Sequence, residues 1–295
     1  MSGLTTKRVR ENNLGQIITA LTPKFANSNS PRLDAQVLLS HVTQQPRTWI
    51  LAHNEYNLTP NQNHQLADAV ARLEAGVPLP YVLGHWEFYN LTFNLSTDVL
   101  IPRPETESLV EMGIDWLKNH PQARNAADIG TGSGCIAVSL AVNIPDLRVN
   151  AVDISEGAID IARSNAVKHG VIDRINVVQG DLLNQPPSDL LDVTQHFNLI
   201  TANLPYIPTE TLHQLNVYQR EPTLALDGGP DGLSLIRKLL QKAPPFLAPG
   251  GLILLEIEAS QGKTAIELAQ KYFKESTIKL HPDLAGHDRL ISIQT

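Results

Sequence analysis

Apolar residues recur with two different periods along the chain, and the change between them falls near residue 105. Before about residue 75 they are spaced three and four apart, as in Leu14, Ile17, Ile18 and Leu21, and this spacing predicts helices. From residue 105 onward, short apolar runs alternate with helical spacing. Such alternation is typical of an α/β fold, in which helices cover both faces of a mostly parallel sheet.

Two helix starts in the first part of the chain are marked by a hydroxyl residue followed by proline. Ser30-Pro31 and Thr59-Pro60 each place an N-cap residue before a proline at the first helical position. Gly76 can end the second of these helices. Because the apolar stripes are too short to be stable alone, we expect residues 1–76 to form a small helical domain.

Residues 77–104 have a different pattern, in which aromatic residues alternate with polar ones. Alternation on both sides of Asn90 predicts a short hairpin. Pro102 and Pro104 are expected to hold the following segment in an extended path outside any helix. We interpret 77–104 as a linker with a hairpin that forms a wall beside a binding site.

The remainder, residues 105–295, is predicted to be one α/β domain with a seven-stranded sheet. Its predicted strands are 126–129, 148–154, 175–179, 197–202, 251–257, 276–280 and 289–293. Its predicted helices are 107–117, 134–142, 155–169, 232–242 and 261–273.

Three successive strand ends carry residues suited to binding a nucleoside. The glycine-rich turn 128–134 follows the first strand; its backbone can approach a ligand closely, and the next helix offers free N–H groups. Asp153 ends the second strand, where its carboxylate can accept hydrogen bonds from a ribose diol. Asp181 and Leu182 follow the third strand and suit the amino group and ring face of adenine. Together these positions predict a nucleoside cofactor.

The spacing of the glycines indicates which cofactor. Cys135 stands where the dinucleotide fingerprint requires its third glycine, and no phosphate-binding lysine follows the turn. The arrangement resembles the S-adenosylmethionine site of class I methyltransferases. The residues that we expect to bind this cofactor are Gly130, Thr131, Gly132, Ser133, Gly134, Asp153, Asp181, Leu182 and Asn203.

The segment Asn203-Leu204-Pro205-Tyr206 follows the fourth predicted strand, at the edge where open α/β sheets place their ligands. A planar amide or amino nitrogen is a poor nucleophile, so a methyltransferase must orient it. The Asn203 side-chain oxygen and a backbone carbonyl beside Pro205 can accept both N–H groups of such a nitrogen, and Tyr206 can pack against it. These four residues are the predicted catalytic residues; a plain turn closed by proline is the alternative.

Composition and charge restrict the partners. The chain has 295 residues, of which 42% are hydrophobic, and no apolar run reaches the length of a membrane span. The first eight residues lack the apolar core of a signal peptide, so we expect a cytoplasmic protein without a membrane partner. The single cysteine excludes an internal disulfide, and no ligand spacing indicates a metal.

The charge distribution argues against a nucleic-acid partner. The formal net charge is −7, and residues 91–295 hold sixteen lysines and arginines against twenty-four aspartates and glutamates. A domain that grips a nucleic-acid backbone is expected to show the opposite balance.

Several motifs together resemble the HemK/PrmC family of protein-(glutamine-N5) methyltransferases. Besides the helical domain and the glycine turn, they are Gly84-His85-Trp86-Glu87-Phe88, the segment 101–107, the segment 221–226, and the segment 283–289. The resemblance implies methylation of the glutamine in the Gly-Gly-Gln loop of peptide-chain release factors. It also implies that Asn203 to Tyr206 bind the glutamine amide and that the helical domain docks the release factor.

Leu204 departs from the family pattern, which is Asn-Pro-Pro-Tyr. We expect activity to persist with a less rigid loop and Leu204→Pro to increase the rate of transfer. Two alternatives stay open: an N6-adenine nucleic-acid methyltransferase, which would use the same chemistry on a flipped base, and a non-catalytic relative that binds release factors.

Overall fold

The computed structural model describes residues 13–26, 28–184, 196–283 and 285–295. The first eight residues, on which the expectation about a signal peptide rests, and Leu284 of the segment 283–289 lie outside this part. The chain divides into two compact units, 1–84 and 85–295. The division falls inside the segment 77–104, and the domain limits given by the sequence stay a prediction.

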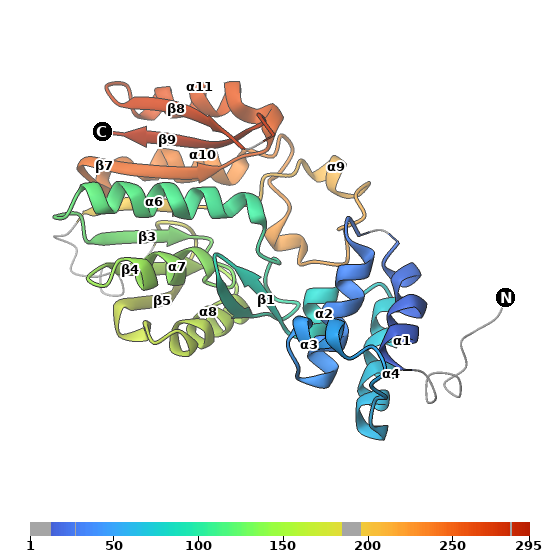
Figure 1. Ribbon diagram of the computed structural model, residues 1–295. Helices are drawn as coiled ribbons and strands as arrows, with labels where there is room; N and C mark the ends of the chain where they lie inside the picture. Colours follow the sequence, from blue (N-terminus) through green and yellow to red (C-terminus); the bar gives the residue numbers. More distant parts are fainter. Residues whose placement is uncertain (1–12, 27, 185–195, 284) are drawn as a thin grey trace. The chain divides into compact units, whose positions relative to one another are not determined.

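The first unit is built from helices in the part that the structure describes (Figure 1). The α-helices are α1 (Leu14–Leu21), α2 (Pro31–Thr43), α3 (Arg47–Ala52), α4 (Pro60–Glu74) and α5 (Leu79–Leu83), and a 3-10 turn, η2, spans Thr22–Phe25. Leucines and isoleucines from α1 to α4 fill the core; Leu14, Leu38, Ile50 and Leu66 are at most 1% exposed. Each amphipathic helix therefore buries its apolar stripe within this unit.

Capping explains where two of these helices begin. Asn13 with Gln16, and Thr59 with Gln62, form reciprocal capping boxes at α1 and α4. The side chain of Ser30, by contrast, makes no cap hydrogen bond, so its predicted N-cap interaction is wrong. Pro31 alone marks the start of α2, with its backbone already fixed at a helical φ.

The second unit contains a seven-stranded sheet in the order β5-β4-β3-β6-β7-β9-β8. The strands are β3 (Asn125–Ile129), β4 (Arg148–Asp153), β5 (Ile175–Gln179), β6 (Phe197–Ala202), β7 (Leu247–Glu256), β8 (Thr277–Pro282) and β9 (Asp288–Gln294). Neighbouring strands are parallel from β5 to β7, and β9 is antiparallel to β7 and β8. The prediction of a mostly parallel seven-stranded sheet is confirmed.

Helices cover both faces of this sheet (Figure 1). They are α6 (Glu107–Asn119), α7 (Cys135–Asn143), α8 (Glu156–Lys168), α10 (Ser234–Lys242) and α11 (Gly262–Tyr272), and the short α9 spans Thr209–Leu212. Residues of α6, α7 and α8 pack in one core cluster, and residues of α10 and α11 pack in the other. The central strands β3 and β6 are therefore almost fully buried, whereas β8 at the edge of the sheet alternates exposed and half-buried residues.

Strand register brings the candidate residues to one edge of the sheet. Ile129 pairs with Val152 on β4 and with Ala202 on β6, and Ala202 pairs with Leu255 on β7. The residues that follow these positions therefore leave the sheet side by side. A binding site at this carboxyl edge agrees with the rule for open parallel sheets.

A short hairpin precedes the sheet. Its strands are β1 (His85–Phe88) and β2 (Leu91–Asn94), joined through Tyr89 and Asn90, both with positive φ. Two residues with positive φ match the right-handed twist of a hairpin, and the hairpin prediction is confirmed. The expectation that Pro104 lies outside any helix is wrong, because Pro104 begins the 3-10 turn η3 (Pro104–Thr106).

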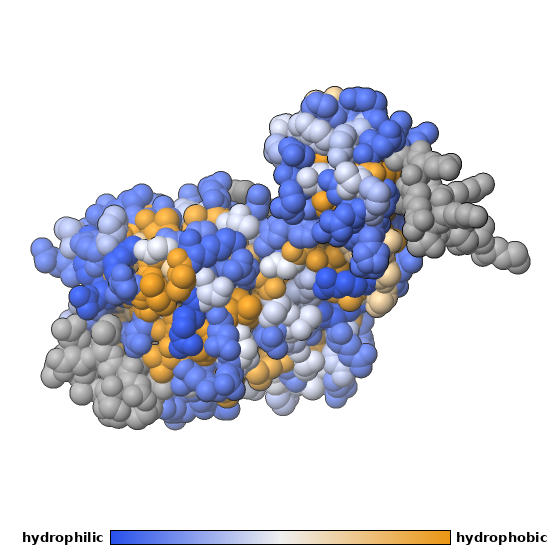
Figure 2. Space-filling view, turned by 90° about the horizontal axis from the view of Figure 1, so that it is seen from below, coloured by the Kyte–Doolittle hydropathy of each residue, from blue (hydrophilic) through white to orange (hydrophobic). Residues whose placement is uncertain are grey.

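The outer surface mixes polar and apolar residues. On the face drawn in Figure 2, hydrophilic residues dominate and apolar residues lie among them. Among the described residues, no helix is both long and apolar enough to cross a membrane.

Candidate functional site

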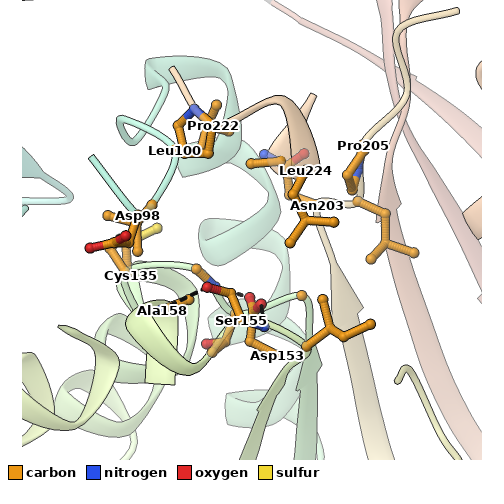
Figure 3. A pocket seen from close by; sticks show the side chains of 18 of the residues that line it. Asp98, Leu100, Cys135, Asp153, Ser155, Ala158, Asn203, Pro205, Pro222 and Leu224 are labelled. Carbon is orange, nitrogen blue, oxygen red and sulfur yellow. Dashed lines mark hydrogen bonds between the residues drawn. The ribbon is translucent and has the colours of Figure 1, made fainter. Parts of the chain in front are cut away.

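A cavity of about 290 Å³ opens at the carboxyl edge of the sheet. The predicted residues that line it are Gly130, Thr131, Gly132, Ser133, Asp153, Asp181, Leu182, Asn203, Leu204 and Pro205. Figure 3 shows Asn203 across the cavity from Asp153 and Ser155. The structure therefore brings residues from four separate segments of the sequence into one space, while Gly134 and Tyr206 lie outside its lining.

The glycine turn follows β3 and is tied to β4. The N–H groups of Gly130 and Thr131 both donate to the Val152 carbonyl, at 2.8 and 3.0 Å. Gly132 has φ +54°, and a Cβ added there would meet no atom within 4 Å, so its backbone is open to the cavity. The positive φ favours glycine at this position, and the absence of a side chain leaves space beside the backbone.

Gly134 has a different role from Gly132. Its φ is +77°, and an added Cβ would lie 3.2 Å from both Cα and Cβ of Ala162 on α8. The glycine lets the first turn of α7 pack closely against α8. Gly134 therefore supports the site from outside the cavity.

Asp153 holds the turn and faces the cavity at once. Its Oδ2 accepts a hydrogen bond from the Gly132 N–H at 2.8 Å, and its Oδ1 accepts one from the Ser155 N–H at 3.0 Å. Burial raises the pKa of this carboxyl above its usual range. Each oxygen keeps further acceptor capacity, which a ligand diol in the cavity can use.

Leu182 adopts an uncommon backbone conformation beside the cavity. Its φ is +55°, a value that costs a residue with a Cβ roughly 1–2 kcal/mol. The side chain is buried at 7% exposure, while the preceding Asp181 is exposed. The left-handed conformation turns the chain after β5, so that Asp181 and Leu182 both line the cavity.

Asn203 belongs to a chain of side-chain hydrogen bonds that ends on a buried carboxylate. Asn203 Nδ2 donates to Thr106 Oγ1 at 2.9 Å, and Thr106 Oγ1 donates to Glu256 Oε2 at 2.6 Å. The Tyr206 hydroxyl donates to Glu256 Oε1 at 3.3 Å. Thr106 and Glu256 are each 2% exposed. The Asn203 amide nitrogen therefore has a defined, buried partner in Thr106, which Glu256 holds in turn.

Glu256 is a strongly perturbed acid. Burial raises its pKa to about 7, against the hydrogen bonds from Thr106 and Tyr206, which lower it. Burial and the neighbouring Glu256 charge raise the pKa of Tyr206 in turn. A carboxyl that titrates near neutrality next to a candidate site is a common property of functional residues.

Leu204 and Tyr206 are held by the surrounding structure. Leu204 is 3% exposed, and a Cβ added at Gly130 would lie 2.8 Å from Leu204 Cδ2. The Tyr206 carbonyl accepts a hydrogen bond from Gln261 Nε2 at 2.9 Å. The segment 203–206 is thus fixed by the core on one side and by polar bonds on the other.

Sequence reasoning did not identify Thr106 and Glu256 as parts of the site. Glu256 ends an apolar strand at the same edge as Asp153, so the rule that selected Asp153 would also have found Glu256. Thr106 had no such signal, because its two partners lie 97 and 150 residues away. Arg103, also in the cavity lining, forms an ion pair with the buried Glu221 at 2.6 Å.

Cys135 is a buried thiol at the cavity wall. Burial raises its pKa to about 12, so it carries a proton at neutral pH. With 9% exposure it acts as a small buried residue of the core. Throughout the described part of the chain, no group of three or more histidines, cysteines, aspartates and glutamates could hold a metal ion.

Comparison with known proteins gives matches over both units. The PrmC N-terminal domain family matches residues 16–84, and the methyltransferase small domain family matches residues 110–220. A release factor glutamine methyltransferase of Moorella thermoacetica is 43% identical over 260 residues, covering 88% of this chain and 89% of the relative. Proteins of the same name from Rhodopirellula baltica and Bordetella pertussis are 37% and 36% identical, with coverage of at least 90% of each chain.

Solved structures resemble the chain in fold. The catalytic domain of hMettl16, in complex with the MAT2A 3′UTR hairpin 6, has a TM-score of 0.53 at 14% identity. It covers 79% of this chain, and 81% of that domain is covered. At this identity the likeness concerns the class I methyltransferase fold alone.

Proposed function

The chain belongs to the release factor glutamine methyltransferase family, and from this premise we propose its reaction. It transfers a methyl group from S-adenosylmethionine to the side-chain amide nitrogen of the glutamine in the Gly-Gly-Gln loop of release factors. The observation that carries the proposal is the position of Asn203, which lines the same cavity as the glycine turn and Asp153.

The cavity residues fit S-adenosylmethionine. Gly132 leaves open space beside the backbone, Asp153 offers carboxylate acceptors for a ribose diol, and Leu182 offers a buried apolar contact for a ring. In the proposed complex, Gly130 to Ser133, Asp153, Asp181 and Leu182 hold the cofactor, and Gly134 supports the turn. The bound cofactor supplies an electrophilic methyl group on a sulfonium.

The acceptor glutamine is held by oxygen atoms. Its amide has two N–H groups, and we assign one to Asn203 Oδ1 and the other to the Leu204 backbone carbonyl. Two acceptors fix the nitrogen in orientation and favour the positive charge that develops on it. Once methylated, the nitrogen loses one proton to water, so that no strong base is required. Pro205 restricts the loop, and Tyr206 anchors it through Glu256.

A protein substrate also suits the charge of the molecule. The formal net charge of −7 disfavours contact with a nucleic-acid backbone. The family match over residues 16–84 supports the proposal that the helical unit docks the release factor. Nucleic acid is therefore the control substrate in the test.

The test incubates the protein and methyl-labelled S-adenosylmethionine with an unmodified release factor. A release factor with its loop glutamine replaced and a duplex DNA serve as controls. We expect label on the intact factor alone, and Asn203→Ala is expected to abolish it. Asn119→Ala, at an exposed position at the end of α6, is the matched control and should leave the rate unchanged. Label on DNA, or on the factor without its glutamine, would contradict the proposal.

Leu204→Pro tests the effect of the family's usual proline. We expect about a fivefold faster transfer, equivalent to ~1 kcal/mol, because proline reduces the freedom of the loop. Loss of the packing of Leu204 against Gly130 should lower the melting temperature of the same variant. A rate that is unchanged or slower in the folded variant would refute this account.

A further inference from the structure

The hydrogen bond from Asn203 to Thr106 determines which end of the Asn203 amide stays free for a ligand in the cavity. An asparagine amide has an acceptor end and a donor end, and a half-turn of the side chain exchanges them. Only the acceptor end can receive an N–H group of a glutamine amide. The proposed reaction therefore requires that the oxygen, and not the nitrogen, faces the acceptor.

Thr106 determines the orientation of the Asn203 amide. A threonine hydroxyl has one hydrogen to donate, and Thr106 donates it to Glu256 Oε2 at 2.6 Å. An ionised carboxylate can only accept, so the direction of this bond is settled by Glu256. Toward Asn203, Thr106 Oγ1 then has only lone pairs, and it receives Nδ2 at 2.9 Å. Among the residues that the structure describes, none donates a hydrogen bond to Asn203 Oδ1.

We infer that Thr106 and Glu256 are positioning residues that hold the Asn203 amide with its oxygen toward the acceptor glutamine. This inference rests on the proposed function for the identity of the acceptor. The three groups act in series: the Glu256 carboxylate orients the Thr106 hydroxyl, and the hydroxyl orients the amide. Tyr206 occupies the other carboxylate oxygen and keeps Glu256 from turning away.

The protonation state of Glu256 controls the direction of the hydrogen bonds that join Glu256, Thr106 and Asn203, which we call the relay. When Glu256 is neutral, its own O–H can donate to Thr106, and the threonine hydrogen is then free to donate to Asn203 Oδ1. That arrangement stabilises the reversed amide, which presents N–H groups to the acceptor. Because the Glu256 pKa is raised to about 7, the productive orientation should be lost as the pH falls through about 7.

Other charged and titratable groups also face Glu256. They are Glu105 beside Thr106, Tyr206 after β6, Arg289 on β9 and Cys135 on α7. The raised pKa values of Tyr206 and Cys135 keep both protonated, and arginine stays charged.

Thr106→Val and Thr106→Ser are a matched pair for the test. Valine keeps the shape but removes the hydroxyl, so we expect kcat for the release factor to fall about tenfold or more. Serine keeps the hydroxyl and should stay within about threefold of the unaltered protein. Both variants are first checked for unaltered folding and for S-adenosylhomocysteine binding, because Thr106 also lines the cavity. A folded Thr106→Val protein with full kcat would overturn the inference.

A pH profile separates positioning from a structural role. For the unaltered protein, kcat should rise with an apparent pKa of about 7. Glu256→Gln has no proton to lose, so its profile should be flat across this range while its kcat is reduced. The same rise in Glu256→Gln would show that another group is responsible and would refute the role of Glu256.

A spectroscopic measurement tests the relay even if the release factor is not the substrate. With asparagine labelled by nitrogen-15, the Asn203 Nδ2 signals are assigned by their absence in Asn203→Ala. We expect them to shift with a midpoint near pH 7 and to lose that shift in Glu256→Gln. Chemical shifts that change neither with pH nor in Glu256→Gln would refute the relay. A protein that shows the shift but does not methylate release factors would instead refute the proposed function alone.

Discussion

At the scale of single residues, the two glycines Gly132 and Gly134 look equivalent in the sequence but differ in the structure. Both have positive φ, yet a Cβ at Gly132 enters open space and a Cβ at Gly134 meets α8. In the proposed complex the first glycine contacts the cofactor, whereas the second allows α7 to pack closely against α8.

This difference predicts that alanine at Gly132 mainly weakens cofactor binding, whereas alanine at Gly134 mainly lowers stability. Gly132→Ala should weaken S-adenosylmethionine binding at least tenfold and lower the unfolding free energy by ~1 kcal/mol, the cost of positive φ. Gly134→Ala should lose more stability, because the contact at 3.2 Å to Ala162 adds to that cost, and should lose less affinity. Calorimetric binding and denaturant unfolding measure the two effects. The reverse order in the two variants would contradict the assignment.

Residue identity at the cavity was predictable where the strand ends carry their own signal. Asp153 and Asn203 each follow an apolar run, so their place at one edge of the sheet follows from the pattern alone. The hydrogen bonds between Thr106, Asn203 and Glu256 join three segments of the chain. The spacing of residues in one sequence does not predict contacts between segments so far apart. These hydrogen bonds could therefore be identified only in the structure.

At the scale of the elements, helix starts depend on whether a side chain reaches the free N–H groups. The sequence suggests the same N-cap role for Ser30 and Thr59, because a proline follows each. Only Thr59 accepts a side-chain hydrogen bond from the third residue of its helix, Gln62, and the Thr59 N–H donates to Gln62 Oε1 in return.

Alanine substitution at the two positions should therefore give different results. We expect Thr59→Ala to lower the unfolding free energy by about 1 kcal/mol, because it removes a capping bond. Ser30→Ala is the matched control and should change it by less than about 0.5 kcal/mol. Denaturant unfolding of the full chain, followed by tryptophan fluorescence, measures both. Equal losses would mean that Ser30 also caps its helix in solution.

Strands that form apolar runs between turn residues were predictable, and very short helices were not. The sequence placed β5 and β6 at their observed bounds, because each is an apolar run between turn residues. The helices α3 and α5 have six and five residues, too few to show a period of 3.6 residues. Strand β7 begins four residues before its prediction, in the sequence Leu247-Ala248-Pro249-Gly250, whose proline and glycine indicate a turn.

At the scale of the whole molecule, one buried carboxyl should make stability depend on pH. The folded pKa of Glu256 is about 7, above its ordinary value of 4.5. The folded protein therefore holds this proton more tightly than the unfolded chain does. The contribution to stability is fully present below pH 4.5 and is lost as the pH rises through about 7.

Glu256→Gln should remove this dependence. Relative to the unaltered protein, the variant should gain on the order of 3 kcal/mol in unfolding free energy between pH 5 and pH 8. Comparing the two proteins at each pH cancels other titrating groups, including Asp128, whose pKa burial raises to about 6. The measurement is denaturant unfolding at both values. A constant difference between the proteins would show that Glu256 is already ionised at pH 5.

The state of Cys135 also has a practical consequence for labelling the molecule. It is the single cysteine of the chain, and its pKa of about 12 leaves only ~1 thiolate in 10⁵ molecules at pH 7. Maleimides and other thiol reagents should therefore not react with Cys135 in the folded protein. One cysteine introduced at any exposed position would carry a fluorophore or spin probe at that position alone, with no background residue to remove first.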